Sequence, residues 1–463
     1  MKAILKKTAV FILLLGMITS CEDYLELDAP KEKIESSTLF QNDETAHSAL
    51  VGLYNQLASV NFSGGGPSSL TVLNALSGDL LMPIYTRNQE YMQFEQHELL
   101  PLNFRNENLW TSAYNIIYIT NALLEGIEGS DNLSEEVRDK IQGEASFIRA
   151  FTYFYLVNLY GDVPLILTTD YRENSLAERV PQEKVYQQIL TDLETAISLL
   201  SSDNSTGDRT VVNKNTAVAM MARVQLYLEN WNDAELYSSQ IIDQTETFKL
   251  LEDLNSVFLA NSKEAIWQIS PESRGYSLTN TQEGGMFIIH PLYYFLAQFK
   301  FTPSFIDSFT TDDKRLSDWI GFHESTSFYF PFKYKIQNST EDATEFSMVL
   351  RLAEQYLIRA EARARQNDLA GAISDLDKIR ERAGLMAISQ TYPEIGQEAL
   401  LQMILEERKK ELFTEWGHRW LDLKRTDKAG DIFVENWEST DIFYPIPEND
   451  RLKNPNLTQN EGY

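Results

Sequence analysis

Two carboxylates in the last part of the chain are spaced as a pair that could do acid–base chemistry. Glu407 and Glu411 lie one helical turn apart, so a helix would place both on one face. Glycosidases use two carboxyl groups of this kind. Arg408 and Arg419 are close in the sequence, however, and a neighbouring arginine favours the ionised form of a carboxyl group. We therefore expect these residues, with Asp422, to form an ion network that ties the last helix to the core.

Other motifs for catalysis or metal binding are missing from the sequence. The histidines are far apart and lack the close helical spacing of a zinc pair: His47, His97, His290, His323 and His418. The sequence has no GxSxG motif, no phosphate-binding glycine loop and no CxxC motif. It therefore predicts neither an enzyme nor a metal site nor another cofactor.

Aromatic residues outside the periodic segments offer a different chemistry, the binding of sugars. The C–H groups of a pyranose pack on a flat ring, and flanking polar groups bond to the hydroxyls. Within residues 61–106 the candidates are Tyr85, Tyr91, Phe94 and Phe104, with Asp79 and Arg87 as polar partners. Within residues 267–345 the candidates are Tyr276, Tyr293, Tyr294, Trp319, Phe328 and Tyr329. For each ring, packing beneath a loop is the competing interpretation.

The two stretches that carry these rings lack a helical period. Residues 61–106 include Gly64-Gly65-Gly66-Pro67, and residues 267–345 include Gly284-Gly285 and several prolines. Glycine and proline interrupt helices, so we expect long irregular loops and short strands here. Loops of this length in a compact protein usually carry function, which makes them the expected ligand site.

The rest of the chain is predicted to be the helical scaffold that positions these loops. Apolar residues recur every three or four positions over residues 137–159, and Gly161 follows. The same period predicts helical hairpins over residues 217–241 and 350–383, the second with Gly384 as its C-cap. Small residues where the two helices meet are typical of tetratricopeptide-like hairpins. The predicted fold class is therefore mostly α, with an α-solenoid-like core.

The N-terminus has the layout of a secretory signal peptide. Lysines precede an apolar run that is too short to span a membrane and that ends at Cys21. The sequence Ile18-Thr19-Ser20-Cys21 is similar to a bacterial lipobox, in which the cysteine is acylated and becomes the new N-terminus. We therefore expect residues 1–20 to be removed, Cys21 to be lipidated, and residues 21–38 to link the lipid to the fold.

Charge and cysteine content exclude several classes of protein. The 463 residues include 40 Lys+Arg and 68 Asp+Glu, which gives a net charge of −28. Nucleic acids and anionic membranes attract cationic surfaces, so the sequence predicts no nucleic-acid partner. A single cysteine excludes a disulfide framework. The fold must be held by packing and by polar contacts.

Segments spread along the chain form a set with a characteristic order. They are Trp110-x3-Tyr114-x2-Ile117-x3-Asn121; residues 144–151 with Tyr160-Gly161-Asp162-Val163-Pro164-Leu165; residues 350–362 with Arg380-Glu381-Arg382-Ala383-Gly384-Leu385; and residues 407–425 with Tyr444-Pro445-Ile446-Pro447 and residues 454–463. In order and spacing they resemble the SusD/RagB family of outer-membrane nutrient-binding lipoproteins. The resemblance covers nearly all of the mature chain, with residues 39–463 as one SusD-like domain.

The resemblance implies a lipoprotein that captures a nutrient at the cell surface and delivers it to a SusC-like TonB-dependent transporter in the outer membrane. Ligands across the family are mostly glycans, and peptides in RagB-type branches. Residues 77–87 resemble the family stretch in which an aspartate and an arginine, here Asp79 and Arg87, contribute to the glycan site. The acidic residues Glu22 and Asp23 resemble the export signal of surface lipoproteins in Bacteroidetes. A helical-repeat interaction scaffold and a surface glycosidase remain as alternatives.

Overall fold

The protein is predominantly helical, as the sequence predicts. The structure, a computed structural model, describes residues 39–203, 207–272, 280–434 and 437–463. The predicted signal peptide, the predicted lipidation site Cys21 and the predicted linker lie outside the described residues. Among the described helices, none combines the length and the apolar character that crossing a bilayer requires.

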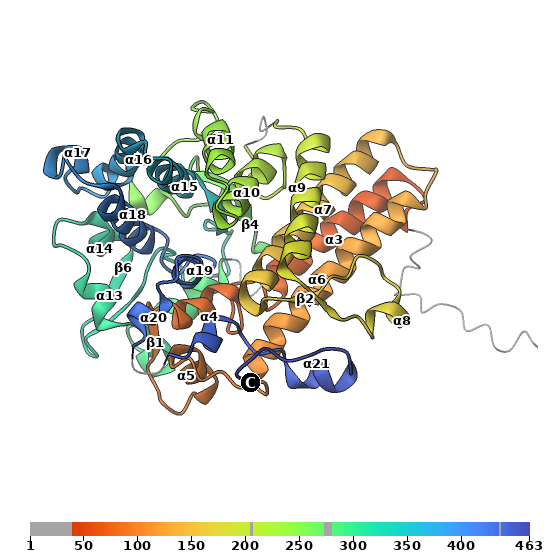
Figure 1. Cartoon of the computed structure of the whole chain (residues 1–463), viewed down its shortest axis with the longest axis horizontal. Coiled ribbons are helices and arrows are strands. Elements are labelled where there is room, and N and C mark those ends of the chain that lie inside the picture. The colour runs from red at the N-terminus through yellow and green to blue at the C-terminus, as the bar shows by residue number, and fades with distance from the viewer. Residues whose placement is uncertain (1–38, 204–206, 273–279, 435–436) are drawn as a thin grey trace, which may run out of the picture.

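The long helices form a continuous row in which each packs against the next (Figure 1). In the order of packing they are α3 (Asp43–Ser59), α6 (Phe104–Glu128), α7 (Glu135–Tyr160), α9 (Gln182–Leu199), α10 (Lys214–Tyr227), α11 (Trp231–Ile242), α15 (Leu352–Arg365), α16 (Leu369–Arg382) and α18 (Gln397–Glu411). Each buries an apolar face against its neighbours, which is how tandem helical hairpins build a core. The predicted α-solenoid-like core is confirmed.

Helix α7 shows how local sequence sets these elements. The Ser134 side chain caps its N-terminus by accepting a hydrogen bond from the Val137 backbone N–H. The helix ends at Gly161, whose φ of +72° suits glycine. Its second half is buried on nearly every side because α3, α6, α9 and α10 all contact the helix.

The two predicted hairpins stack on each other through small residues. Ala222 of α10 and Ala234 of α11 meet Ala362 of α15 in one buried apolar cluster. Gly384 follows α16 with φ +83°, as the C-cap prediction requires. Helix α15 begins at Leu352 and not at residue 350, because the residues before it form a strand.

The strands are short and occur as antiparallel pairs. The pairs are β1 (Leu81–Pro83) with β5 (Phe299–Phe301), β2 (Val163–Pro164) with β3 (Arg179–Val180), β4 (Ala265–Ile269) with β8 (Ser347–Arg351), and β6 (Ile320–His323) with β7 (Phe328–Pro331). The β4–β8 pair frames the second irregular region, so that region leaves and re-enters the scaffold at one place. The β1–β5 pair joins the first irregular region to the second.

The irregular regions contain more helix than the sequence predicts. Region 61–106 includes α4 (Leu70–Ser77) and α5 (Gln89–Glu95). Every residue of α4 is buried, and at eight residues the helix is too short for periodicity alone to distinguish it from a buried strand. The other short helices are α8 (Tyr171–Asn174), α12 (Gln282–Phe287), α13 (Pro303–Asp307), α14 (Lys314–Asp318), α17 (Ile388–Thr391), α19 (His418–Arg425), α20 (Ala429–Ile432), α21 (Glu448–Lys453), η2 (Leu254–Ser256), η4 (Tyr294–Leu296) and η5 (Ser439–Ile442).

A buried ion network joins the second irregular region to the scaffold, and Glu411 is its centre. The Glu411 carboxylate lies 3.2 Å from Arg315 Nη1 and 2.6 Å from Arg351 Nη1, and it also bonds to Arg382. Burial favours the neutral form of Glu411, but the three arginines outweigh burial and hold its pKa well below the ordinary range. Glu407 pairs with Arg315 at 2.7 Å.

The expected ion network is therefore present and larger than the sequence indicates. Arg408 pairs with Asp422 at 2.7 Å, and Arg419 pairs with Asp79 at 2.8 Å. An acid in catalysis must carry a proton near neutral pH. Glu411 is held ionised by its arginines and does not meet that requirement.

We expect the substitution Glu411→Gln to lower the free energy of unfolding by about 3–5 kcal/mol, because it leaves buried arginines without their shared partner. Equilibrium unfolding in urea, followed by tryptophan fluorescence, measures this loss. The control is Glu398→Gln, at an exposed position on the same helix. Equal midpoints for the two variants would contradict the role assigned to Glu411.

Candidate functional site

Trp319 is in the core, which corrects the expectation that it stacks on a ligand. Its side chain is fully buried, with 0% of its surface exposed. The indole Nε1–H donates to the Leu254 carbonyl at 2.9 Å, and the ring packs edge-on against Phe258. The ammonium group of Lys333 lies 4.8 Å from the ring centroid. No face of this ring is open to a ligand.

Tyr91 and Phe94 are also core residues, and the expectation that they bind ligand is corrected in the same way. The Tyr91 hydroxyl donates to the Pro67 carbonyl at 3.1 Å, and its ring packs edge-on against Phe299 of β5. The Phe94 ring packs edge-on against Tyr444. Both rings are buried because α5 turns them inward, toward the scaffold.

Asp79 and Arg87, the two polar partners expected at one glycan site, lie in different environments. Asp79 has φ +57°, and its carboxylate pairs with Arg419 of α19 and, at 3.1 Å, with Lys409 of α18. The Arg87 guanidinium lies 4.7 Å from the centroid of the Tyr85 ring and is exposed. The structure thus assigns Asp79 to the ion network and leaves Arg87 at the surface. Tyr276 lies outside the described residues.

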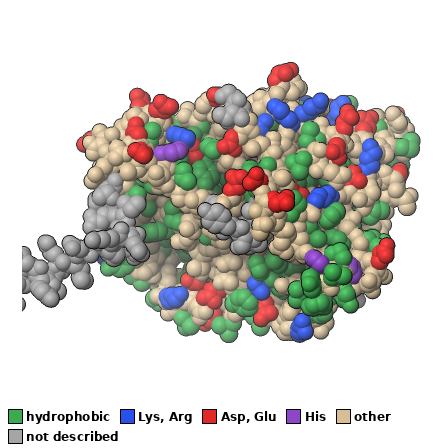
Figure 2. All heavy atoms as spheres, turned by 180° about the vertical axis from the view of Figure 1, so that it is seen from behind, with side chains coloured by type: hydrophobic (Ala, Val, Ile, Leu, Met, Phe, Trp, Pro, Cys, Tyr) green, Lys and Arg blue, Asp and Glu red, His purple; other side chains and the backbone are tan. Residues whose placement is uncertain are grey.

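An exposed apolar surface lies where the two irregular regions meet. Consecutive residues 292–296, around η4, and two residues of the β6–β7 hairpin have 37–73% of their surface exposed. We call this surface the aromatic patch, and it consists of Leu292, Tyr293, Tyr294, Phe295, Leu296, Phe322 and Tyr329. Figure 2 shows the face on which hydrophobic side chains gather beside histidines, at the lower right. Exposed apolar side chains gathered in this way mark a candidate interaction site.

Three sets of contacts fix the turn that carries residues 292–296. The His290 Nδ1 accepts hydrogen bonds from the backbone N–H groups of Leu292 and Tyr293, at 3.0 and 3.1 Å. The Tyr85 hydroxyl, from the first irregular region, donates to the Phe295 carbonyl at 3.0 Å. His323 of the hairpin contacts the Tyr294 ring, with centroids 5.2 Å apart.

The β6–β7 hairpin contributes a pair of rings on one face. Phe322 and Tyr329 are register partners, so their side chains lie on the same side of the hairpin. Their ring centroids are 4.7 Å apart. Phe328 lies beside them in sequence, and Lys300 Nζ is 4.4 Å from its ring centroid. Of the sequence candidates, Tyr293 and Tyr294 are therefore exposed side by side on the turn, and Tyr329 is exposed with Phe322 on the adjacent hairpin.

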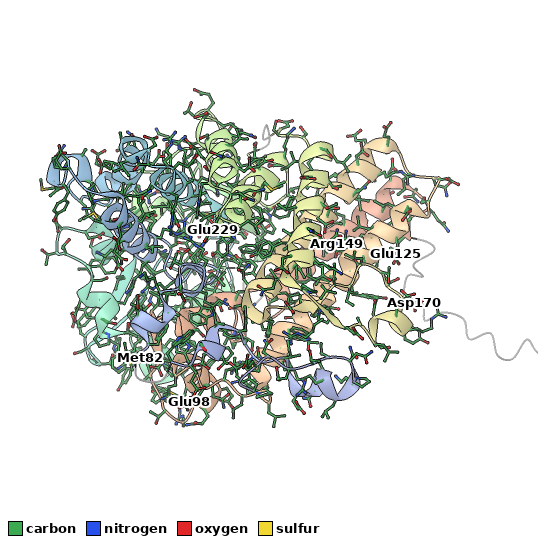
Figure 3. All side chains as sticks on the ribbon, viewed as in Figure 1. Met82, Glu98, Glu125, Arg149, Asp170 and Glu229 are labelled. Carbon is green, nitrogen blue, oxygen red and sulfur yellow. The ribbon has the colours of Figure 1, made fainter. Side chains whose placement is uncertain are left out.

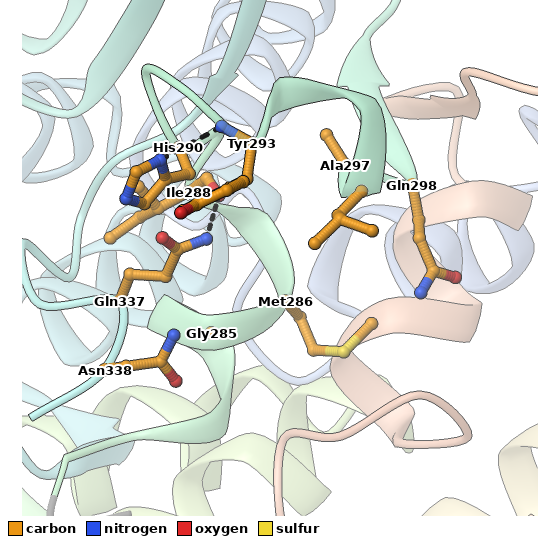
Figure 4. A pocket seen from close by; sticks show the side chains of 10 residues that line it. Gly285, Met286, Ile288, His290, Tyr293, Ala297, Gln298, Gln337 and Asn338 are labelled. Atoms are coloured by element: carbon orange, nitrogen blue, oxygen red, sulfur yellow. Dashed lines mark hydrogen bonds between the residues drawn. The ribbon is translucent and has the colours of Figure 1, made fainter.

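A pocket of about 250 Å³ opens beside the aromatic patch and shares Tyr293 and Leu296 with it (Figure 4). Three amide side chains lie around it, from Gln298, Gln337 and Asn338. Figure 4 shows Gln298 on one side of the hollow and the other two amides on the opposite side. Sequence reasoning missed these three residues, because a glutamine or asparagine in a loop follows no pattern that singles it out.

The hollows at the other end of the molecule are lined in part by polar groups that already have partners. Arg149 forms two hydrogen bonds with Asp192, at 2.9 and 2.7 Å, in a groove between α6, α7 and α9. Glu125 bonds to the Thr169 backbone N–H at 2.8 Å. Figure 3 shows Glu125 and Arg149 in the half of the molecule opposite to Met82 of β1. These groups are used by the fold, which leaves the aromatic patch as the stronger candidate.

Within the parts of the chain that the structure describes, no three histidine, cysteine or acidic side chains cluster as a metal site would need. The donor groups of the candidate site are hydroxyls, amides and one imidazole. They can form hydrogen bonds to a neutral polar ligand and offer flat apolar faces to its carbon atoms.

Comparison with known proteins gives consistent matches along the chain. Residues 23–226 match the family model described as "Starch-binding associating with outer membrane", and residues 319–439 match the model of the SusD family. A SusD-like protein of Formosa agariphila is 25% identical, with 98% of each chain covered. The starch-binding protein SusD of Bacteroides thetaiotaomicron is 23% identical, with 84% of each chain covered.

A solved structure agrees with these sequence matches. A SusD superfamily protein of Bacteroides vulgatus superposes with a TM-score of 0.81 at 22% identity, covering 92% of this chain and all of that one. The row of helices and the insertion framed by strands agree with this superposition. The sequence matches near both ends of the chain indicate the same family. The chain belongs to the SusD/RagB family.

Proposed function

We propose that this chain is a cell-surface lipoprotein that binds a glycan on the aromatic patch and delivers it to a SusC-like TonB-dependent transporter. The observation that carries the proposal is the exposure of three aromatic rings and their flanking leucines on a turn held by three sets of contacts. An apolar surface of this size is costly to leave in water unless a ligand or partner covers it.

The chemistry of the aromatic patch suits a carbohydrate. Each pyranose ring has an apolar face of C–H groups that packs on a tyrosine or phenylalanine ring. The Tyr293, Tyr294 and Tyr329 hydroxyls form no hydrogen bond with other described residues, so they are available to sugar hydroxyls. A turn fixed in advance by His290 and Tyr85 loses little conformational freedom when a ligand binds.

The family relationship supports the same function. One matching family model is described as starch-binding, and one relative carries the name of a starch-binding protein. SusD-family proteins bind carbohydrate without catalysis, so the chain is not an enzyme. The family is associated with the outer membrane. Delivery to a transporter and anchoring through Cys21 are part of the proposal.

A peptide is the second candidate ligand, because Leu292 and Leu296 offer aliphatic surface as well as rings. A binding screen of the mature chain against glycan and peptide panels separates the two. Binding to a glycan and to no peptide supports the proposal. Binding only to peptides would assign the chain to the RagB-type function.

We expect Tyr329→Ala and Tyr294→Ala each to weaken binding of the best glycan by about 2- to 12-fold. One stacked ring contributes about 0.5–1.5 kcal/mol beyond the area that it buries. Isothermal titration calorimetry measures the change. The matched control is Tyr171→Ala, because Tyr171 is an exposed tyrosine of α8 in the other half of the molecule.

Circular dichroism establishes that each variant is folded. Both patch tyrosines are exposed, so their removal leaves the core intact. Unchanged affinity in both patch variants would exclude the aromatic patch as the glycan site.

We expect Cys21→Ala to leave a folded protein that is no longer tethered to the membrane. Acyl chains supply membrane affinity, and a chain with one cysteine has no internal disulfide to lose. Fractionation of cells that lack the neighbouring transporter measures the distribution between membrane and soluble fractions. A variant that still sediments with outer membranes would show that lipidation is not the anchor.

A further inference from the structure

We propose that the pocket beside the aromatic patch binds a single uncharged sugar unit, at the end of a glycan chain or as its side branch. This inference rests on the proposed function and deepens it, because it names the chemical class of the unit and the residues that select it. The argument begins with the size of the pocket. A volume of about 250 Å³ is just below the range of about 300–1,000 Å³ typical of pockets for drug-sized ligands.

That size suits one sugar ring and not a chain of them. The pocket opens next to Tyr293 and Leu296, which also belong to the aromatic patch. A glycan packed on the patch can therefore place one unit in the pocket without leaving the patch.

The amide groups of the pocket have unused hydrogen-bonding capacity. Gln337 Nε2 donates once, to the Ile288 carbonyl at 2.7 Å, which leaves its carbonyl oxygen and one N–H free (Figure 4). The side chains of Gln298 and Asn338 form no hydrogen bond with any other described residue. Each amide offers both a donor and an acceptor. Neighbouring hydroxyls of a sugar, which also donate and accept, match such groups.

The remaining lining is apolar or neutral. Met286, Ile288 and Ala297 supply surface for C–H groups. The His290 Nδ1 accepts two backbone N–H bonds, so the neutral ring carries its proton on Nε2. The second ring nitrogen is then a hydrogen-bond donor.

The pocket contains no group that would neutralise an acidic sugar. Among the described residues that line it, none is aspartate, glutamate, lysine or arginine. A carboxylate or sulfate placed there would lose its hydration and gain no cationic partner, which is unfavourable. Arg87 and Lys300, the cations near the aromatic patch, lie over the rings of Tyr85 and Phe328 and do not line the pocket.

The test compares neutral and acidic glycans on the mature chain and on one pocket variant. The neutral probes are soluble starch, laminarin, xyloglucan and galactomannan, and the acidic probes are polygalacturonate, alginate and carrageenan. The variant is Gln298→Met, which keeps the size of the side chain and removes its polar atoms. The Gln298 side chain forms no hydrogen bond with other described residues, and the substitution keeps the backbone carbonyl that accepts from the Ile84 N–H at 2.8 Å, so we expect the fold to be unchanged. The control is Gln240→Met, at an exposed glutamine of α11.

We expect the tightest binding to a neutral glycan, and we expect Gln298→Met to weaken it by about 2- to 12-fold, the range for one lost hydrogen bond. Gln240→Met should have no effect. Tighter binding to an acidic glycan would overturn the inference and leave the proposed function standing. A neutral glycan whose binding is weakened by Tyr329→Ala and not by Gln298→Met would also overturn the inference and leave the proposed function standing. Failure of the folded chain to bind any of the seven glycans would overturn the proposed function and this inference with it.

Discussion

Buried arginines are the constraint on which this structure depends. An arginine side chain stays charged at any physiological pH, so burying one without a carboxylate partner is costly. Arg315, Arg351 and Arg382 come from the insertion, from β8 and from α16, and all three meet at Glu411. Segments far apart in the chain are thereby brought to one point. The inner edge of the insertion is thereby fixed to the helical scaffold.

The sequence predicts the helices that have one apolar face and one polar face. Helix α7 and the two stacked hairpins have apolar stripes with the helical period, and Gly161 and Gly384 mark their ends. Helix α4 is buried on every side and is only eight residues long, so its apolar run does not distinguish a helix from a buried strand. Strand β8 directly precedes α15 and continues its run of apolar residues, which hides the boundary between them.

The candidate site is harder to predict because an aromatic residue in a loop has no stripe to indicate its direction. Trp319, Tyr91 and Phe94 point inward, where an indole N–H or a phenol hydroxyl finds a backbone carbonyl. The residues that do face solvent share a different signal. Residues 292–296 are five large apolar side chains in a row, and a single tight turn is too short to bury all of them. Which residues pair as ions, by contrast, depends on the folded geometry. Sequence spacing predicts a network only within residues 407–422, and it does not indicate the arginines that reach Glu411 from other segments.

The strand pair β4–β8 has an implication for how such proteins diversify. It brings the two ends of residues 267–345 to adjacent antiparallel strands, so the insertion is closed at its base whatever its length. The entropy of closing a loop grows only slowly with the number of residues in it. Natural variation can therefore lengthen, shorten or rebuild the outer part of the insertion at little thermodynamic cost to the helical row. The outer loops and the helical scaffold are separable parts of this architecture, so selection can change the first while the second is inherited unchanged.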